Sequence, residues 1–269
     1  MKRNILLVAS LYAALCMAAE AHDRFLKLDS FFVRPNDKVA IQLFNGTFTT
    51  SEKPVGREWM ADVSVIDPSG ARKSPAASAW RDDAKMSTLD LETGPAGDYV
   101  VGLATKENSI VMKGERFNRY LEHDGIPDVL AARQRDGELD KEARERYAHH
   151  AKALVQAGDA RTDSFKSALG HPVEIIPQQN PYGLKVGETL QFMCLRDGKP
   201  IAGQFVTAGY EHGGAVTAAP SVRADANGVA SIKLESPGKW YVKFIHMSKS
   251  ADPAFDYESR WATLTFEMR

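Results

Sequence analysis

The sequence predicts a mainly β protein of two immunoglobulin-like or transthyretin-like β-sandwich domains with a helical insertion between them. Three observations predict this class. Turn residues recur between short apolar runs, one pattern of strand and turn residues occurs twice, and the apolar period changes between the two copies. We expect the domains at residues 22–112, 113–170 and 171–269, after a signal peptide at residues 1–21.

Turn signals are densest in the second copy. Asp197-Gly198-Lys199-Pro200 lies between two apolar runs, where glycine accepts positive φ and aspartate bonds to its own backbone. Asp225-Ala226-Asn227-Gly228 precedes the alternating stretch from Val229 to Leu234. A further strand is expected from Trp240 to His246, with alternate side chains on one face. Short strands with turns at this spacing are typical of a sandwich.

The same pattern occurs once more upstream. The stretch from Leu89 to Leu103 parallels the stretch from Ile232 to Phe244, and both contain a Gly-containing turn before an apolar strand. The entries also correspond, because the segment Pro35 to Val39 resembles the segment Val186 to Leu190. Two pairs of similar segments in the same order indicate two domains of the same kind.

The first residues have the features of an export signal. Lys2-Arg3 is a basic start, the apolar run from Ile5 to Cys16 is too short for a membrane span, and Ala19-Glu20-Ala21 fits a cleavage site. Lipid attachment at Cys16 is the alternative, which the preceding Leu15 disfavours. We therefore expect a periplasmic protein that begins at His22 and is not embedded in a membrane after cleavage.

The amino-acid composition limits the classes of partner that we expect for this protein. The chain has 34 Lys and Arg against 35 Asp and Glu, scattered along the sequence, for a formal net charge of −1. A balanced, dispersed charge argues against nucleic acid as a partner. Removal of the leader would leave Cys194 as the single cysteine, so no internal disulfide is expected.

The middle segment has a helical period. Ile126-Pro127 behind Asp124-Gly125 predicts a helix that reaches about Arg135. A second helix is expected from about Asp140 to Gln156, ending at Gly158. Its apolar stripe would contain Leu139, Ala143, Tyr147, His150, Ala151 and Leu154.

Motifs of common enzymes are missing from the sequence, so we expect no enzyme. The sharpest chemical feature arises on cleavage after Ala21. His22 would then offer its α-amine and imidazole Nδ1 together as a chelate, which suits Cu(II) or Ni(II), with the Asp23 carboxylate nearby. The alternative is that histidine occupies the first position by chance.

His246 is the second candidate ligand. It ends an expected strand, and Met247 and a loop carrying Asp256 and Glu258 follow it. The alternative is a hydrogen-bonded histidine at a strand end beside solvated acids. His149 and His150 are neighbours, so on a helix their side chains diverge by about 100°. Only His150 would then face the sandwich, as an interface residue rather than a ligand.

Several motifs resemble an exported family of unknown function that has been described as the periplasmic component of cobalt and nickel uptake. They are His22-Asp23, Glu145-Arg146-Tyr147, Ala151-Lys152-Ala153-Leu154, Glu174-Ile175-Ile176-Pro177, Asn180-Pro181, Asp197-Gly198-Lys199-Pro200, Pro237-Gly238-Lys239-Trp240, His246-Met247, Glu258-Ser259, Trp261-Ala262 and Leu264-Thr265-Phe266. The resemblance covers essentially the whole mature chain and implies a periplasmic, two-domain β protein tied to divalent metal uptake. His22 and His246 match family histidines. Two stretches depart from the family, Phe255-Asp256-Tyr257-Glu258 where relatives have Asp-Trp-Glu, and the pair His149-His150.

The resulting hypothesis is a periplasmic protein that binds a divalent transition metal ion, nickel or cobalt or alternatively copper or zinc, and passes it to a membrane metal transporter. The expected metal residues are His22, His246, Asp256 and Glu258. The alternative is a metal-free module that binds protein or glycan through loops at the sandwich ends. Aromatic residues gathered at one end would favour it, with Trp59, Trp80 and Tyr210 as candidates.

Overall fold

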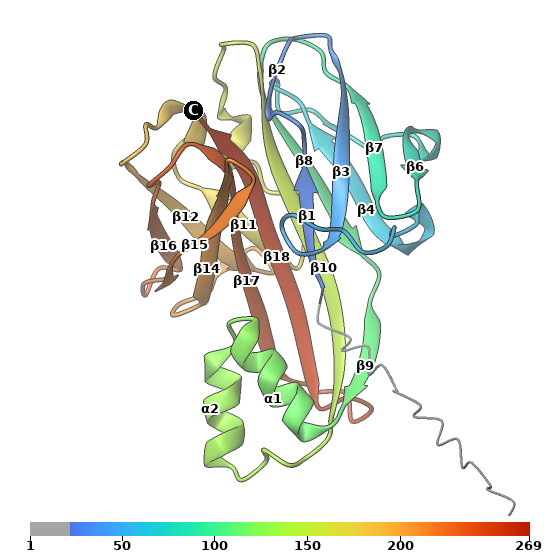
Figure 1. Ribbon diagram of the computed structural model, residues 1–269, viewed down its shortest axis with the longest axis vertical. Coiled ribbons are helices and arrows are strands. Elements are labelled where there is room, and N and C mark those ends of the chain that lie inside the picture. Colours follow the sequence, from blue (N-terminus) through green and yellow to red (C-terminus); the bar gives the residue numbers. More distant parts are fainter. Residues whose placement is uncertain (1–21) are drawn as a thin grey trace, which may run out of the picture.

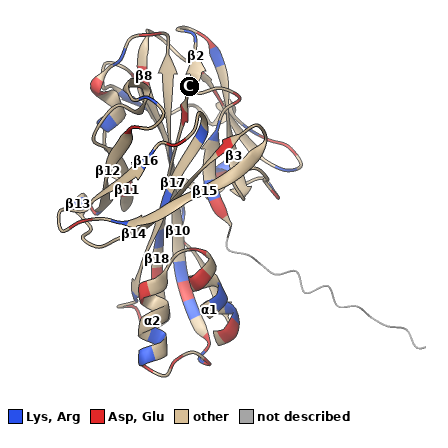
Figure 2. Cartoon of the chain, turned by 60° about the vertical axis from the view of Figure 1, so that its left-hand side comes forward, with Lys and Arg blue, Asp and Glu red and all other residues tan. Residues whose placement is uncertain are grey.

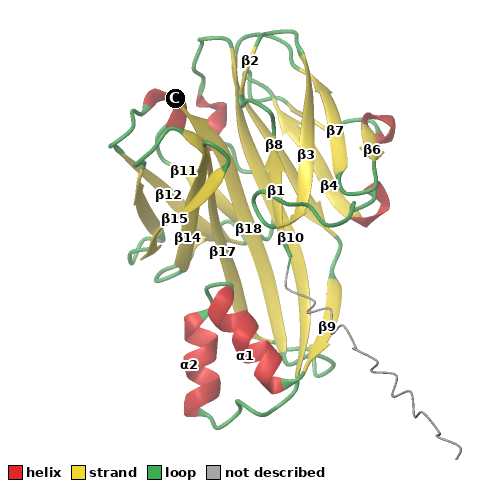
Figure 3. Cartoon of the chain, in the orientation of Figure 1, coloured by secondary structure: helices red, strands yellow, loops and turns green. Residues whose placement is uncertain are grey.

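Three β-sheets contain half of residues 22–269, the part of the chain that the computed structural model describes (Figures 1 and 3). The prediction of a mainly β, sandwich-type fold is confirmed. The predicted signal peptide at residues 1–21 lies outside the described residues.

Two small sheets flank one large one. The N-terminal sheet has the order β1 (Asp23–Lys27), β3 (Lys38–Gly46), β7 (Ser87–Glu92), β6 (Trp80–Asp82). The C-terminal sheet consists of β11 (Val173–Pro177), β12 (Thr189–Arg196), β13 (Lys199–Pro200) and β16 (Val229–Lys233). The central sheet runs β15 (Ala215–Arg223), β14 (Phe205–His212), β17 (Gly238–Lys249), β18 (Tyr257–Met268), β10 (Ala143–Ala157), β8 (Gly97–Thr105), β4 (Met60–Ile66), β5 (Arg72–Lys73), and both β2 (Phe32–Val33) and β9 (Asn108–Met112) pair with β10.

The two small sheets cover opposite faces of the central sheet. Thr265 of β18 donates a hydrogen bond through Oγ1 to the backbone oxygen of Leu26 in β1, at 2.5 Å. Lys152 of β10 points the other way and pairs with Glu174 of β11. Since side chains alternate along a strand, odd-numbered residues of β10 and β18 face β1 and even-numbered ones face the C-terminal sheet. One main hydrophobic cluster takes residues from all three sheets, and two smaller clusters lie beside it.

The second predicted helix, from Asp140 to Gln156, is wrong. The segment forms β10, a strand of 15 residues that is parallel to β18 and antiparallel to β8. Residues 148–157 are all buried, because both faces of this central strand are covered. Such a strand has no polar side to reveal a two-residue period, and its many alanines favour a helix when the tertiary contacts are unknown.

The first predicted helix is confirmed. It is α2 (Pro127–Arg135), and α1 (Gly114–His123) precedes it. Phe117 and Leu121 of α1 pack against Ile245 and Trp261 at the end of the central sheet, so the helices extend that sheet at the bottom of Figure 1. The central sheet takes strands from residues 22–112, 113–170 and 171–269 alike. The domain boundaries at residues 112 and 170 stay predictions.

Charges of both signs are interspersed over the strands and over both helices (Figure 2). Within residues 22–269, neither helix has the length and apolar character needed to cross a bilayer.

Candidate metal centre

The start of the described chain lies across the centre of the large sheet. Thr263 Oγ1 of β18 donates to the backbone oxygen of Arg24 at 2.6 Å. Two residues later, Thr265 Oγ1 donates to the backbone oxygen of Leu26. The strands β1 and β18 therefore advance together, two residues at a time. Two residues before Arg24 in β1 and before Thr263 in β18, the same spacing places His22 over Trp261.

His22 is held by one of its two ring nitrogens. Its Nε2 lies 3.1 Å from Oε2 of Glu52, in the loop after β3. An imidazole that binds a metal commonly gives its other ring nitrogen to a carboxylate, which orients the ring and fixes its tautomer. Glu52 supplies this partner on the Nε2 side. The nitrogen left over, Nδ1, is the one that forms a chelate ring with an α-amine.

His149 lies beneath this position. It is the partner of Trp261 in the register of β10 and β18, and the two rings are 4.9 Å apart. The side chain is 5% exposed, and within residues 22–269 no hydrogen bond to its ring nitrogens is formed, whereas its backbone N–H is bound to Thr105. Burial, followed by the positive charge of Arg24, holds the pKa of His149 well below its ordinary value. The neutral form of the imidazole is therefore favoured.

Two cationic side chains, Arg24 and Lys243, lie near His22 and His149, which together are called the His22 centre. Each cation contacts carboxylate or carbonyl oxygens. Arg24 donates to the His22 backbone oxygen at 3.1 Å and to the side chain of Asn45. Burial lowers the pKa of its guanidinium to about 10. Lys243 of β17 lies 2.6 Å from Asp23 and 3.5 Å from Asp124. Burial raises the pKa of Asp124 to about 6, against the opposing effect of Lys243.

A chain of hydrogen bonds runs from the centre toward α1. Trp261 Nε1 donates to Ser259 Oγ at 3.1 Å, the Ser259 hydroxyl donates to Glu145, and Tyr120 donates to the same carboxylate oxygen at 3.0 Å. Burial raises the pKa of Glu145 to about 7, although both donors favour the ionised form.

His246 lies on the other face of the sheet. Its Nδ1 is 3.1 Å from Gln204 Oε1, and its Nε2 is 2.7 Å from Nη1 of Arg196 in β12. Lys243 of the same strand contacts Asp23 of β1, so by alternation His246 points away from β1. His22 and His246 are therefore separated by the sheet, and both nitrogens of His246 already have partners.

The two predicted carboxylates are paired with arginines. Asp256 binds Arg144 through both oxygens, at 3.0 and 3.1 Å, and accepts from its backbone N–H. Glu258 pairs with Arg146 and accepts from Ser250 at 3.0 Å. The arginines hold the pKa of each carboxyl below its ordinary value.

The structure thus does not bring the four predicted ligands together. Across residues 22–269 no group of three or more His, Cys, Asp or Glu side chains has the geometry of a metal cluster. The residue that sequence reasoning missed is His149, which lies on the same side of the sheet as His22. Assignment of residues 143–157 to a strand, rather than a helix, would have placed His149 and His150 on opposite faces of a sheet, with His149 on a buried face of its own.

A family model described as a domain of unknown function, DUF4198, matches residues 19–248. The chain belongs to the DUF4198 family. No match to a curated protein was found.

Solved structures that are similar to this DUF4198 chain at low identity include the following three. The D0-D1 domain of intimin is 14% identical, with 91% of this chain and 97% of that chain covered and a TM-score of 0.22. Murine CEACAM1b is 8% identical, with 92% and 98% covered and a TM-score of 0.21. Trypsin-activated α2-macroglobulin from Escherichia coli is 10% identical with a TM-score of 0.25, and while 91% of this chain is covered, it spans 15% of that one.

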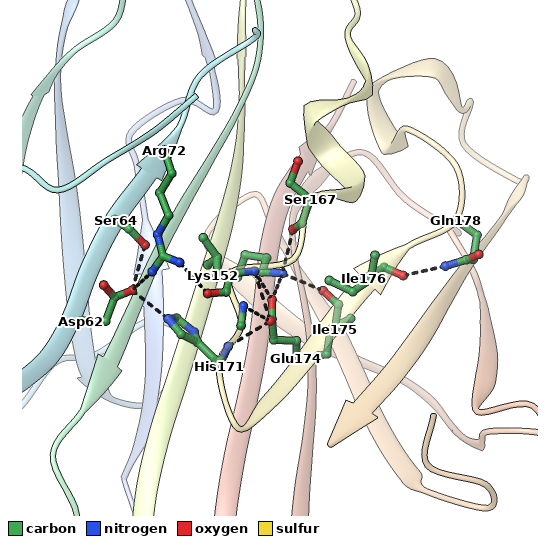
Figure 4. Close-up of polar contacts among 12 residues, drawn as sticks. Asp62, Ser64, Arg72, Lys152, Ser167, His171, Glu174, Ile175, Ile176 and Gln178 are labelled. Atoms are coloured by element: carbon green, nitrogen blue, oxygen red, sulfur yellow. Dashed lines mark hydrogen bonds and ion pairs between the residues drawn. The ribbon is translucent and has the colours of Figure 1, made fainter. Parts of the chain in front are cut away.

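The other face of β10 in this DUF4198 protein carries a polar cluster, the junction network of Asp62, Lys152, His171 and Glu174 (Figure 4). Lys152 Nζ lies 2.7 Å from Glu174, whose oxygens also accept three backbone N–H groups of the preceding loop. His171 Nε2 lies 2.9 Å from Asp62. Each member has a partner, so this cluster is structural.

Proposed function

We propose that the mature protein binds a divalent transition metal ion through His22, as a periplasmic protein that supplies a membrane metal transporter. The observation that carries the proposal is the contact between His22 Nε2 and Glu52, which fixes the ring and leaves Nδ1 for the chelate. Cleavage after Ala21 would free the α-amine of the same residue. The amine and Nδ1 then form a bidentate nitrogen site.

The fold supports a rigid position for this chelate. His22 directly precedes β1, whose Leu26 and Phe25 are buried and whose backbone is bound by two threonines of β18. A ligand on a strand anchored in this way loses little conformational entropy when it binds a metal. The metal is cargo here, and the proposal assigns no catalytic residue.

The metal-free interaction module receives less support from the geometry. Trp59 is exposed on the short 3₁₀ turn Arg57–Trp59, Trp80 begins β6, and Tyr210 of β14 packs on the Trp240 ring at 4.7 Å. These three aromatic side chains belong to separate elements, and within residues 22–269 no ring contact joins one of them to another.

Calorimetric titration of Ni(II), Co(II), Cu(II) and Zn(II) tests the proposal on protein that begins at His22. The comparison protein has one glycine before His22, which moves the amine away from the imidazole and leaves the fold intact. We expect binding that weakens at least about tenfold in the extended form and in Glu52→Gln. His246→Gln is the matched control, because it removes an imidazole on the opposite face of the sheet and should bind metal normally. Equal binding by both N-terminal forms would refute the terminal chelate.

A further inference from the structure

We infer that His149 is the second protein ligand of the His22 centre, so that the site presents three nitrogen donors and selects copper. The inference rests on the proposed function, because it needs the chelate at His22. It adds a buried residue that sequence reasoning assigned to a helix and left out of the metal site.

The register of β1, β18 and β10 brings His22 and His149 to the same place on the sheet. β1 follows β18 residue for residue at Thr263 and Thr265, so His22 lies over Trp261. Trp261 is paired with His149 in the ladder between β10 and β18. The two histidines therefore lie beside the same residue, Trp261, on one face of the sheet, although 126 residues lie between them in the sequence.

His149 differs from the other buried histidines in the hydrogen bonding of its ring. Of the other histidines buried in the central sheet and its flanks, His150 lies 3.2 Å from the Trp261 oxygen through Nδ1, and His171 is bound to Asp62. His149 is equally buried, and its ring packs against the rings of Trp261 and Tyr147. No hydrogen bond to its ring nitrogens is formed within the described part of the chain, so the lone pair of the neutral ring is not used by another residue there.

The charges around the two histidines are largely offset by opposite charges. An imidazole binds a metal in its neutral form. Lys243 is offset by Asp23 and Asp124, while Glu52 adds a negative charge beside His22. Arg24 remains the nearest uncompensated cation, and its guanidinium is directed to the backbone oxygen of His22 and to Asn45.

The donor set then selects the metal. An α-amine and two imidazoles are three neutral nitrogen ligands, without thiolate or carboxylate. Tetragonal nitrogen sites suit Cu(II) best among the divalent ions of the first row, with Ni(II) next, and the general order of affinities also places copper highest. Copper is therefore the expected cargo, ahead of nickel and cobalt.

The test uses mature protein that begins at His22, loaded with Cu(II), together with His149→Gln. Competition with a chelator should show Cu(II) affinity at least about tenfold above Ni(II), and a loss of about tenfold or more for copper in His149→Gln. His150→Gln is the matched control, because this neighbour is also buried but faces the junction network. Its copper affinity should stay unchanged.

Pulsed electron paramagnetic resonance of the unmutated copper protein counts imidazoles without relying on a variant. Two coupled imidazoles support the inference, and one overturns it. Unchanged affinity in His149→Gln also overturns it, while a loss of binding in the glycine-extended form would still uphold the chelate at His22. Absence of copper binding in the unmutated protein would overturn the inference, and the titrations with Ni(II), Co(II) and Zn(II) would then decide the chelate at His22 separately.

Discussion

The junction network and the His22 centre lie on opposite faces of the same strand, and they differ in how completely their polar groups are paired. Lys152 and His150 of β10 face the junction network, where Glu174 alone accepts from three backbone donors and one ammonium group. His149 faces β1 and lacks a hydrogen bond to its ring among residues 22–269. Complete pairing indicates a structural role, and an imidazole without a hydrogen bond has a ring nitrogen available to a ligand.

The largest expected effect comes from breaking the junction network. Lys152→Met would leave the Glu174 carboxylate buried without its cation, since both side chains are about 4% exposed. We expect the free energy of unfolding to fall by about 3–5 kcal/mol in urea denaturation. Lys166→Met is the matched control, because Lys166 pairs with Asp163 in solvent and its loss should not be measurable. Metal affinity should be unchanged in both, and a stable Lys152→Met variant would contradict the structural role.

Glu145 connects the centre to α1, and it should set a pH dependence. Its folded-state pKa of about 7 lies above the ordinary value of 4.5, so its contribution to stability is complete below about pH 4.5 and lost as the pH rises through 7. Glu145→Gln keeps the acceptor for Tyr120 and Ser259 without the charge. We expect it to raise stability by on the order of 2 kcal/mol at pH 8 and to change little at pH 4.

Thermal or urea unfolding at the two pH values checks this expectation. The exposed Glu122→Gln in α1 is the control and should show no such difference. A loss of stability at pH 8 in Glu145→Gln would mean that the carboxylate is ionised and needed in the folded protein.

The smallest effects should come from the two histidines compared directly, in metal-free protein. His171→Leu removes the hydrogen bond to Asp62 and should cost about 1–2 kcal/mol. His149→Leu removes a polar ring without a partner, so we expect no loss, or a gain of up to about 1 kcal/mol. Parallel urea titrations of the two variants measure the difference. Equal losses would show that His149 is a structural residue like His171.

Much of the fold could be predicted from sequence because turn chemistry is local. The turn at Asp197-Gly198 has positive φ at both residues, and the strands on both sides of it are present. The alternation Trp240, Val242, Phe244 is buried as expected. These features depend on neighbours in the chain, which a single sequence contains.

The candidate site was less predictable, because it depends on pairing between distant segments. His22 was found from its chemistry, but His246 was joined to it without knowledge of which face each residue occupies. Asp256 and Glu258 looked free in sequence and are bound to Arg144 and Arg146. His149 required the register of β10 with β18, and its alanine-rich surroundings gave a helical pattern instead.

The position of β18 has a consequence for how the chain reaches its native state. It is the last described strand in sequence order, yet it lies between β17 and β10 and forms the only link between the two halves of the central sheet in the described part of the chain. Pairs such as Glu145 with Tyr257 close a long loop, which makes this step slow. Until it occurs, β10 and β17 each present an unpaired edge, and such edges can pair with other chains, so aggregation competes with folding most strongly at this stage.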